Sequence, residues 1–478
     1  MEVQQFRFYQ FLILSLGGIC LNFSYASPST LQGLTDNEMS AITGQALVSL
    51  SYISPADITN LEAKRSNGDK SIGFYRLGIE SKIEINANIK RLQLGCGGVN
   101  GAGACDIDIE NFSLSGASTA TQDTAANRAA RVQSDAIMNN PFIEFAIKNP
   151  NSASTRSIEG FRLSAESVIG MLTFGSENSQ TSGGVGIPNG INSLSGYMEL
   201  NSASGTAVTN ARNMTQAIGD MTGRVEMCVG AKLGNLCLGV WTPINYTAST
   251  YDIQLSSASA SFTTNPALVN GRRQTAVQLT GIANIGDITF KCPTGQETSC
   301  VIATALGLPL REGVSGTIAN LKANVLVNQN LGLIHKIPVN GNAFSLSLQS
   351  QNIQWPGAAA ANIAQRGWWL AFGGGIDIGS ITPSNNVDIP DSSLRQALGP
   401  AGDRGNTTIN GALYNKMPRC SITGCLFGTV LDIPKIYLGP GNGAPANTPQ
   451  TYVDFPLLNQ VLSAQSFVPN CYGNLKYC

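Results

Sequence analysis

The spacing of the cysteines is the feature that most constrains this chain. Ten of the eleven cysteines fall into five couples, whose members lie 9, 9, 8, 5 and 7 positions apart. In an oxidising compartment, couples this close predict local disulfides. A structural zinc site would need C-x2-C knuckles, and no couple has that spacing. The predicted bridges are Cys96–Cys105, Cys228–Cys237, Cys292–Cys300, Cys420–Cys425 and Cys471–Cys478.

The first 26 residues have the features of a secretory signal peptide, which would also remove Cys20. Arg7 precedes an apolar stretch from Phe11 to Cys20, and Ser24 and Ala26 supply the small residues of a cleavage site. The alternative is a short membrane anchor, but the stretch falls well below the roughly 20 residues that span a bilayer. No later segment is long and apolar enough to cross a membrane. We therefore expect export to the periplasm or, as the favoured location, the cell surface.

Charge is scarce and balanced along the chain. Charged residues make up 12% of it, about half of the roughly 25% found in soluble domains, and 29 basic residues accompany 30 acidic ones. Without a basic run, the chain lacks the positive patch that nucleic-acid binding needs. The one histidine, His335, excludes a multi-histidine metal site, and no nucleotide-binding motif opens a helix. We expect no nucleic-acid partner, no metal and no cofactor.

Alternating apolar and polar residues predict a predominantly all-β fold of long, disulfide-stapled hairpins in packed sheets. The run from Ile79 to Leu94 has this pattern, and so do residues 251–255, 277–282, 321–327 and 344–348. Helical pattern inside the chain is limited to 122–136 and 457–463, which we expect to cover sheet edges. The predicted organisation is a signal peptide (1–26), a motif helix with the first strand (27–53), a β-rich body (54–355) and an irregular Gly/Pro-rich C-terminal region (356–478).

The first cysteine couple predicts a register. If Cys96 faces Cys105 across a hairpin, the apolar positions of both strands change face at the same rung, which indicates a ribbon that passes from one packed layer to another. A bulge would shift one strand alone. The pairs are Leu94 with Ile107, Leu92 with Ile109, Ile89 with Phe112 and Ala87 with Leu114. The same reasoning beside the next two couples pairs Met227 with Leu238, Val225 with Val240 and Phe290 with Ile302.

A short helix with complete end signals follows the cleavage site. Thr35 and Glu38 form a capping box, Leu34 and Met39 have the spacing of a hydrophobic staple, and Gly44 suits the helix end. A helix this short must dock to persist, and a predicted strand, Ala46–Tyr52, follows at once. The motif residues are Leu34, Thr35, Asp36, Glu38, Met39, Ile42, Thr43, Gly44 and Gln45.

The stretch L-T-D-N-E-M-S-A-I-T-G-Q-A resembles the N-terminal signature of the Fil-type pilus assembly protein family of Acinetobacter and related proteobacteria. The resemblance covers about twenty residues strictly and the rest of the chain in composition only. It implies a cell-envelope destination and carries over no catalytic residue. Other envelope or filament proteins are then the expected partners, and a homo-oligomer stays open.

Candidate chemistry is sparse. Asp106, Asp108 and Glu110 share one strand parity and could suggest a calcium or carboxylate cluster, but Ile107 and Ile109 on the other parity favour a solvated strand face. The tryptophans that could form a ligand platform, although packing is favoured, are Trp355, Trp368 and Trp369.

Three functions are therefore carried forward, in this order. The first is a non-enzymatic surface protein that acts in assembly or adhesion of a filament through strand pairing. The second is a glycan- or lipid-binding module that uses the tryptophans. The third is an envelope hydrolase.

Overall fold

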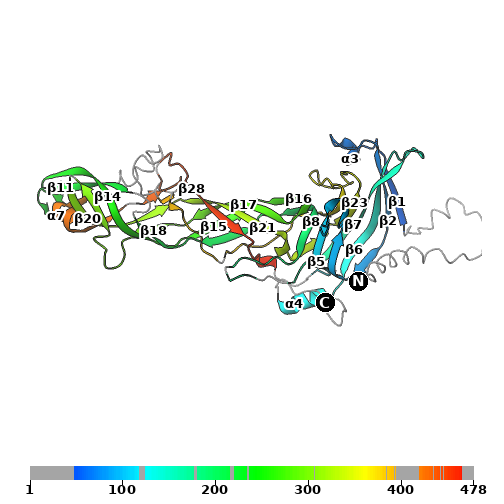
Figure 1. The fold of residues 1–478 in the computed structure, drawn as a ribbon, viewed down its shortest axis with the longest axis horizontal. Coiled ribbons are helices and arrows are strands. Elements are labelled where there is room, and N and C mark those ends of the chain that lie inside the picture. The colour runs from blue at the N-terminus through cyan, green and yellow to red at the C-terminus, as the bar shows by residue number, and fades with distance from the viewer. Residues whose placement is uncertain are drawn as a thin grey trace, which may run out of the picture. The chain divides into compact units, whose positions relative to one another are not determined.

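The computed structural model describes residues 48–117, 124–176, 180–182, 184–215, 220–233, 236–305, 307–383, 385–391, 393–394, 419–433, 435–441, 443–444 and 446–465. They belong to one compact unit that begins at Val48. The fold is all-β: twelve-, nine- and five-stranded sheets carry the described chain, with one two-stranded ribbon and three short α-helices. Figure 1 shows strands of the five-stranded sheet between those of the two larger sheets.

The twelve-stranded sheet holds the N-terminal strands. Its main path is β1-β2-β6-β7-β23-β24-β8-β5-β4, and a further pairing of β5 with β7 closes a ring of five strands, β7-β23-β24-β8-β5. The strands are β1 (Val48–Ile53), β2 (Ile72–Ile79), β3 (Lys82–Ile85), β4 (Ala87–Leu94), β5 (Ile107–Ser115), β6 (Ala136–Lys148), β7 (Ser157–Thr173), β8 (Ile191–Leu200), β16 (Ala267–Gln274), β22 (Lys336–Asn340), β23 (Phe344–Gln349) and β24 (Gly367–Phe372).

The other sheets show the alternation that the sequence predicts. Along β21, Ala323, Val325 and Val327 are buried while the residues between them are exposed. The five-stranded sheet contains β9 (Ser204–Val208), β15 (Ser259–Thr264), β17 (Ala276–Ile285), β21 (Lys322–Asn330) and β28 (Tyr452–Leu458). The nine-stranded sheet contains β10 (Arg212–Thr215), β11 (Met221–Val229), β14 (Val240–Leu255), β18 (Ile288–Lys291), β19 (Val301–Ala305), β20 (Leu308–Ala319), β25 (Arg419–Ser421), β26 (Thr429–Asp432) and β27 (Ile436–Tyr437). The ribbon is β12 (Lys232–Leu233) with β13 (Leu236–Cys237).

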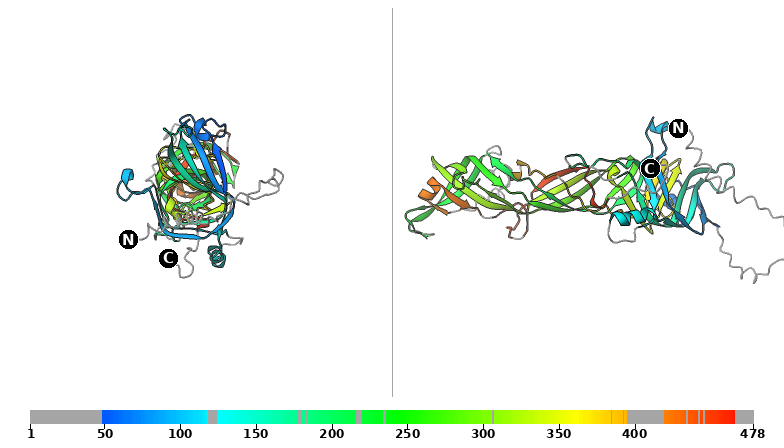
Figure 2. Two further views of the ribbon diagram at one scale, coloured as in Figure 1. Left: turned by 90° about the vertical axis from the view of Figure 1, so that its right-hand side faces the viewer. Right: turned by 90° about the horizontal axis from the view of Figure 1, so that it is seen from below.

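The C-terminal region is not separate from the body, which corrects the predicted division at residue 355. Its described strands join all three sheets: β24 lies in the first, β25, β26 and β27 lie in the second, and β28 lies in the third. β25 pairs with β11, β26 and β27 with β20, and β28 with β21, all in parallel. Figure 2 shows these orange and red strands among the green and yellow ones. Glycine and proline content indicated an irregular region, but β28 is an edge strand of the described sheet, where a proline such as Pro456 is tolerated.

Four of the five predicted disulfides are present, Cys96–Cys105, Cys228–Cys237, Cys292–Cys300 and Cys420–Cys425. Cys471 and Cys478 lie outside the described residues. The first hairpin is confirmed: Ala87 pairs with Leu114, Ile89 with Phe112, Leu92 with Ile109 and Leu94 with Ile107.

The ribbon that these pairs form does not change layers. β5 stays in one sheet and exchanges its second partner, from β8 beside Ile107–Ile109 to β7 beside Ser113–Ser115. Asn111, in the left-handed region with φ 46°, lies at the exchange. The run from Ile79 is also not one strand. β2 ends there, and β3 and β4 follow, so Ile79 and Ile83 are 42% and 38% exposed.

The second hairpin has a different register. Met227 pairs with Thr242 and Val225 with Ile244, not with Leu238 and Val240 as predicted. The reason is that the chain between Cys228 and Cys237 forms the small β12–β13 ribbon, so the second cysteine of the couple belongs to that ribbon and not to the ladder.

The third couple closes no hairpin at all. β18 and β19 run in the same direction between β14 and β20, β18 beside Ser315–Ile318 and β19 beside Leu308–Glu312. β18 and β19 therefore occupy two successive stretches of the same place in the sheet. Residues 292–300 form a loop that leaves this place and returns to it, and the Cys292–Cys300 disulfide closes the loop. Phe290 pairs with Gly316 and Ile302 with Arg311, which corrects the predicted pairing of Phe290 with Ile302.

The three α-helices are α3 (Leu61–Lys64), α4 (Ala125–Val132) and α7 (Ile422–Phe427). α4 lies inside the predicted helix 122–136 and begins after Thr124, whose hydroxyl accepts a hydrogen bond from the Asn127 backbone at 3.2 Å. The predicted helix at 457–463 is absent: Leu457 and Leu458 end β28, and only a 3₁₀ turn follows at Ser463–Gln465. Apolar spacing in so short a stretch does not separate the two structures.

Candidate interaction surface

Strand β1 presents apolar side chains to solvent at the edge of the twelve-stranded sheet. It confirms the predicted strand after the motif and pairs with β2, so that Leu50 lies opposite Leu77 and Val48 opposite Ile79. Leu50 is 75% exposed and Val48 is 52% exposed. Within the described chain, no strand pairs with the other edge of β1.

The apolar side chains continue in rows across neighbouring strands. Directly opposite residues point to the same face of a sheet. The register places Leu50, Leu77, Ile143 and Leu163 in one cross-strand row. A second row contains Tyr52, Tyr75, Phe145 and Phe161.

The rings of Tyr52 and Tyr75 stack with their centroids 4.3 Å apart. We name Val48, Leu50, Tyr52, Leu77 and Ile79 the β1 face. All five are at least 39% exposed, so the strand and its neighbour carry a continuous apolar patch of the kind that marks an interaction site.

The opposite parity of β2 is buried in a separate core cluster. Ile72 and Phe74 pack there with Trp355 and Trp369, which are 3% and 1% exposed. Trp368 is half-buried and meets the ring of Phe161 edge-on at 5.8 Å. The packing role favoured from the sequence is what the structure shows for Trp355 and Trp369, and these two rings present no face to a ligand from solution.

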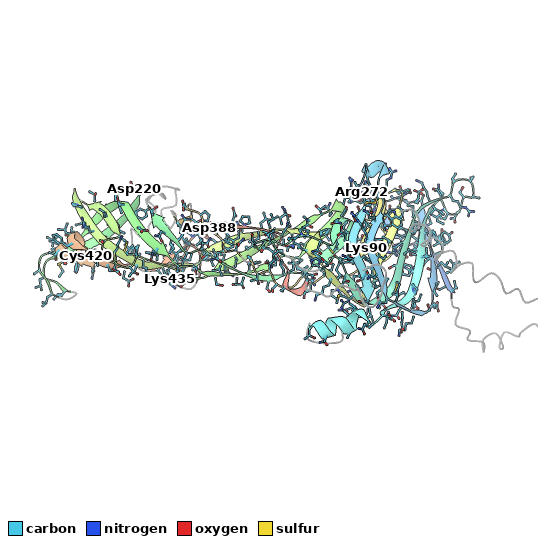
Figure 3. The ribbon with its side chains drawn as sticks, turned by 60° about the horizontal axis from the view of Figure 1, so that its bottom comes forward. Lys90, Asp220, Arg272, Asp388, Cys420 and Lys435 are labelled. Atoms are coloured by element: carbon cyan, nitrogen blue, oxygen red, sulfur yellow. A yellow bond between two sulfur atoms is a disulfide. The ribbon has the colours of Figure 1, made fainter. Side chains whose placement is uncertain are left out.

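The other end of the same sheet is built differently. β4 pairs only with β5 in the described chain, and its central residues, Lys90 and Arg91, are both exposed. Figure 3 labels Lys90. The Arg91 guanidinium donates to the Asp108 carboxylate at 2.8 and 3.0 Å. These hydrogen bonds hold the pKa of Asp108 below its ordinary value. Charged residues on an edge strand discourage pairing with another chain.

The acidic residues of β5 correct a prediction, because two of them do not lie on a solvated face. Asp106 is 3% exposed and Asp108 is 8% exposed. Asp106 accepts from Arg272, from Asn100 and from the backbone of Trp368. Both side-chain parities of β5 are buried at Ile107–Ile109 and at Ser113–Ser115, so neither face of the strand is open to solvent there. Sequence parity cannot reveal the contact of Asp106, since its partner Arg272 lies 166 positions away along the chain.

One group of potential metal ligands occurs in the described chain: Glu312, Cys420 and Cys425. Both sulfurs belong to a disulfide, so they offer no thiolate. Glu312 is fully buried, neither of its carboxylate oxygens has a hydrogen-bond partner among the described residues, and desolvation raises its pKa to about 7. This arrangement favours a neutral carboxyl group. Burial also lowers the pKa of His335, whose Nδ1 lies 3.0 Å from the Phe174 carbonyl oxygen.

The motif residues, from Leu34 to Gln45, lie outside the described residues, and their roles stay predictions. The β1 face is what sequence reasoning missed. The strand was predicted, but its exposure was not, although V-S-L-S-Y-I has alternate apolar residues and no charge. The absence of charge in this strand was the sequence signal that could have indicated an edge suited to pairing.

Four disulfides fit an extracytoplasmic protein. Among the helices of the described chain, none has the length and apolar character needed to span a bilayer. No family model matches the chain, and neither a curated protein nor a solved structure matches it.

Proposed function

We propose that this is an exported, non-enzymatic cell-surface protein that acts in the assembly or adhesion of an extracellular filament. The contact is strand addition: a partner strand pairs, through backbone hydrogen bonds, with the edge of β1 that no described strand occupies. Its alternate apolar side chains then extend the rows that begin at Leu50 and Tyr52. The partner is an envelope or filament protein with an uncharged, alternating strand.

One observation carries this proposal. β1 is an edge strand without charge, and Val48, Leu50 and Tyr52 on it are exposed. Natural edge strands usually carry a lysine, a proline or a bulge that prevents such pairing. An edge without these features either has a partner or aggregates. The resemblance of the N-terminal signature to the pilus assembly family supplies the kind of partner.

The test is Leu50→Lys in cells that make the protein at its native level. The lysine places a charge in the first apolar row, so we expect loss of the protein from the filament or surface fraction, measured by fractionation and immunogold labelling. Leu233→Lys is the matched control, because Leu233 is 72% exposed but lies in the β12–β13 ribbon. Equal surface assembly of both variants would contradict the role of β1. Periplasmic labelling of the unaltered protein would contradict the surface location.

A further inference from the structure

Three arginines from separate parts of the chain line one pocket of about 320 Å³. Arg272 and Arg273 come from β16, and Arg366 directly precedes β24. Residues 99 and 100, in the loop closed by Cys96–Cys105, form another wall. We name this the arginine pocket; its lining residues used below are Val99, Asn100, Asp106, Arg272, Arg273, Leu348 and Arg366. Figure 3 labels Arg272 in it.

The pocket carries an excess of positive charge. Three guanidinium groups lie around one carboxylate, that of Asp106, and this carboxylate is already engaged. Its Oδ1 accepts from Asn100 at 3.0 Å and from Arg272 at 3.2 Å, and its Oδ2 accepts from the Trp368 backbone at 3.1 Å. An anion from outside would therefore meet little competition from Asp106.

Most donors in the pocket are unused. A guanidinium has five N–H groups. Within the described chain, no hydrogen bond engages the guanidinium of Arg366, and the Nε of Arg272 is buried without a partner. A larger pocket, of about 450 Å³, offers a contrast. There Arg76 and Arg162 both bond to the buried Glu144, and Glu166 and Glu199 also line the pocket, so three carboxylates accompany two guanidinium groups.

The Cys96–Cys105 loop fixes the geometry of the pocket. The Asn100 Nδ2 donates to the Gly95 carbonyl at 2.7 Å as well as to Asp106, and its Oδ1 accepts from Arg272 at 2.8 Å. The Asn100 carbonyl also accepts from Arg273 at 3.3 Å. One loop residue thus positions two of the three arginines, and the disulfide holds that loop closed.

We propose that the arginine pocket binds the carboxylate of an acidic sugar residue. A planar guanidinium matches a planar carboxylate with two parallel hydrogen bonds. The pocket lies near the lower limit of small-molecule sites, about 300 Å³, which suits one sugar unit. Val99, 84% exposed, and the half-buried Leu348 supply apolar surface for the C–H face of the ring. This role is independent of strand pairing at β1, and inorganic phosphate is the competing source of an oxyanion.

The test is isothermal titration calorimetry on the mature chain at low salt, with glucuronate, glucose and inorganic phosphate as three separate probes. We expect glucuronate to bind more tightly than either of the others. Arg366→Gln should weaken glucuronate binding about tenfold, as expected for the loss of a charge-assisted hydrogen bond. Arg366→Lys should weaken it less, because the charge stays and the planar fork is lost.

Arg156→Gln is the matched control, because Arg156 is an exposed arginine between β6 and β7, outside the pocket. A thermal melt of each variant checks folding. Equal affinity for glucose and glucuronate, tighter binding of phosphate, no binding of glucuronate, or an equal loss in Arg156→Gln would each overturn the proposal. Leu50→Lys should bind glucuronate like the unaltered protein, so failure of one proposal is distinguishable from failure of the other.

Discussion

The strands β1 and β4 form the two edges of the twelve-stranded sheet, and an unpaired edge can pair with another chain. The two strands differ in the features that prevent such pairing. Both strands pair on one side only in the described chain. β4 carries Lys90 and Arg91 at its centre, and its neighbour β5 is buried on both faces. β1 has no charge, and its neighbour β2 presents Leu77 and Ile79 to solvent.

The contrast separates an edge that stabilises the fold from an edge that is suited to contact with a partner. A charged edge over a buried neighbour protects the core and repels other strands. An uncharged edge with an apolar face contributes little to the core and remains suited to pairing. One sheet thus has an end built for folding and an end suited to partners, and the following changes test that division from the largest expected effect to the smallest.

The largest expected effect comes from changes in the motif helix, and it would break the comparison between the two edges. If the motif helix covers an apolar surface of this same protein, Met39→Ser with Ile42→Ser should destabilise it by about 3–6 kcal/mol, the value of burying two such side chains. The measurement is the melting temperature of the isolated mature protein. Unchanged stability with lost surface assembly would make the motif a recognition segment for a partner. Asn37→Ser, a polar change in the same motif, is the control.

The next change compares the two ends directly. Ile109 on β5 is fully buried, so Ile109→Ala should lower the free energy of unfolding by about 2–5 kcal/mol. Leu50→Ala removes a side chain that is 75% exposed and should cost less than about 1 kcal/mol. Urea titration measures both values. Similar losses would mean that β1 supports the core as much as β5 does.

Removing charge from β4 should make that edge behave like β1. Lys90→Ile leaves Arg91 with its partner Asp108 but takes away the exposed lysine. We expect self-association that rises with protein concentration, in sedimentation velocity, because an uncharged edge accepts other strands. Lys64→Ile removes an exposed lysine from the helix α3 and not from a strand, and should leave the sedimentation unchanged. A monomer at every concentration would show that charge does not protect β4.

The smallest effect is on pH dependence. The pKa of Asp108 is lowered mainly by its hydrogen bonds with Arg91, so its stabilisation is present above the ordinary value of 3.8 and is lost as pH falls through the lowered pKa. Because the Asp108–Arg91 pair is partly exposed, we expect it to contribute less than about 1 kcal/mol to the free energy of unfolding. Arg91→Gln should remove this acid response of unfolding in urea at pH 2–5. An acid response that persists unchanged would place its origin elsewhere.

Glu312 must be replaced in that experiment. Its pKa is raised from 4.5 to about 7, so its neutral form is favoured and stability increases as pH falls between those values. This sign is opposite to that of Asp108. A Glu312→Gln background removes this opposing response, and comparing it with and without Arg91→Gln separates the contribution of Asp108 from that of other carboxylates with a lowered pKa, such as Asp69.

One of the three local pairings could be predicted from the sequence, the other two predictions were wrong, and no long-range pairing could be predicted. The Cys96–Cys105 register was correct because apolar residues on both strands change parity at the same distance from the bridge. The Cys292–Cys300 prediction failed because a disulfide across a short loop forms equally well in a hairpin and in an excursion from one strand. Arg272 lies 166 positions from Asp106, so nothing in the local pattern joined them. For the same reason the arginine pocket was not predicted.

The path of the C-terminal segment has a consequence for when the protein can fold. β25, β26 and β27 complete the nine-stranded sheet, and β28 completes the five-stranded sheet beside β21, more than a hundred positions earlier in the chain. Contacts between such distant segments form slowly, because a long loop must close first. Until residues 419–458 are in place, β21 lacks its neighbour β28 and stays open to wrong partners. The nine-stranded and five-stranded sheets are therefore complete only after the C-terminal strands have docked.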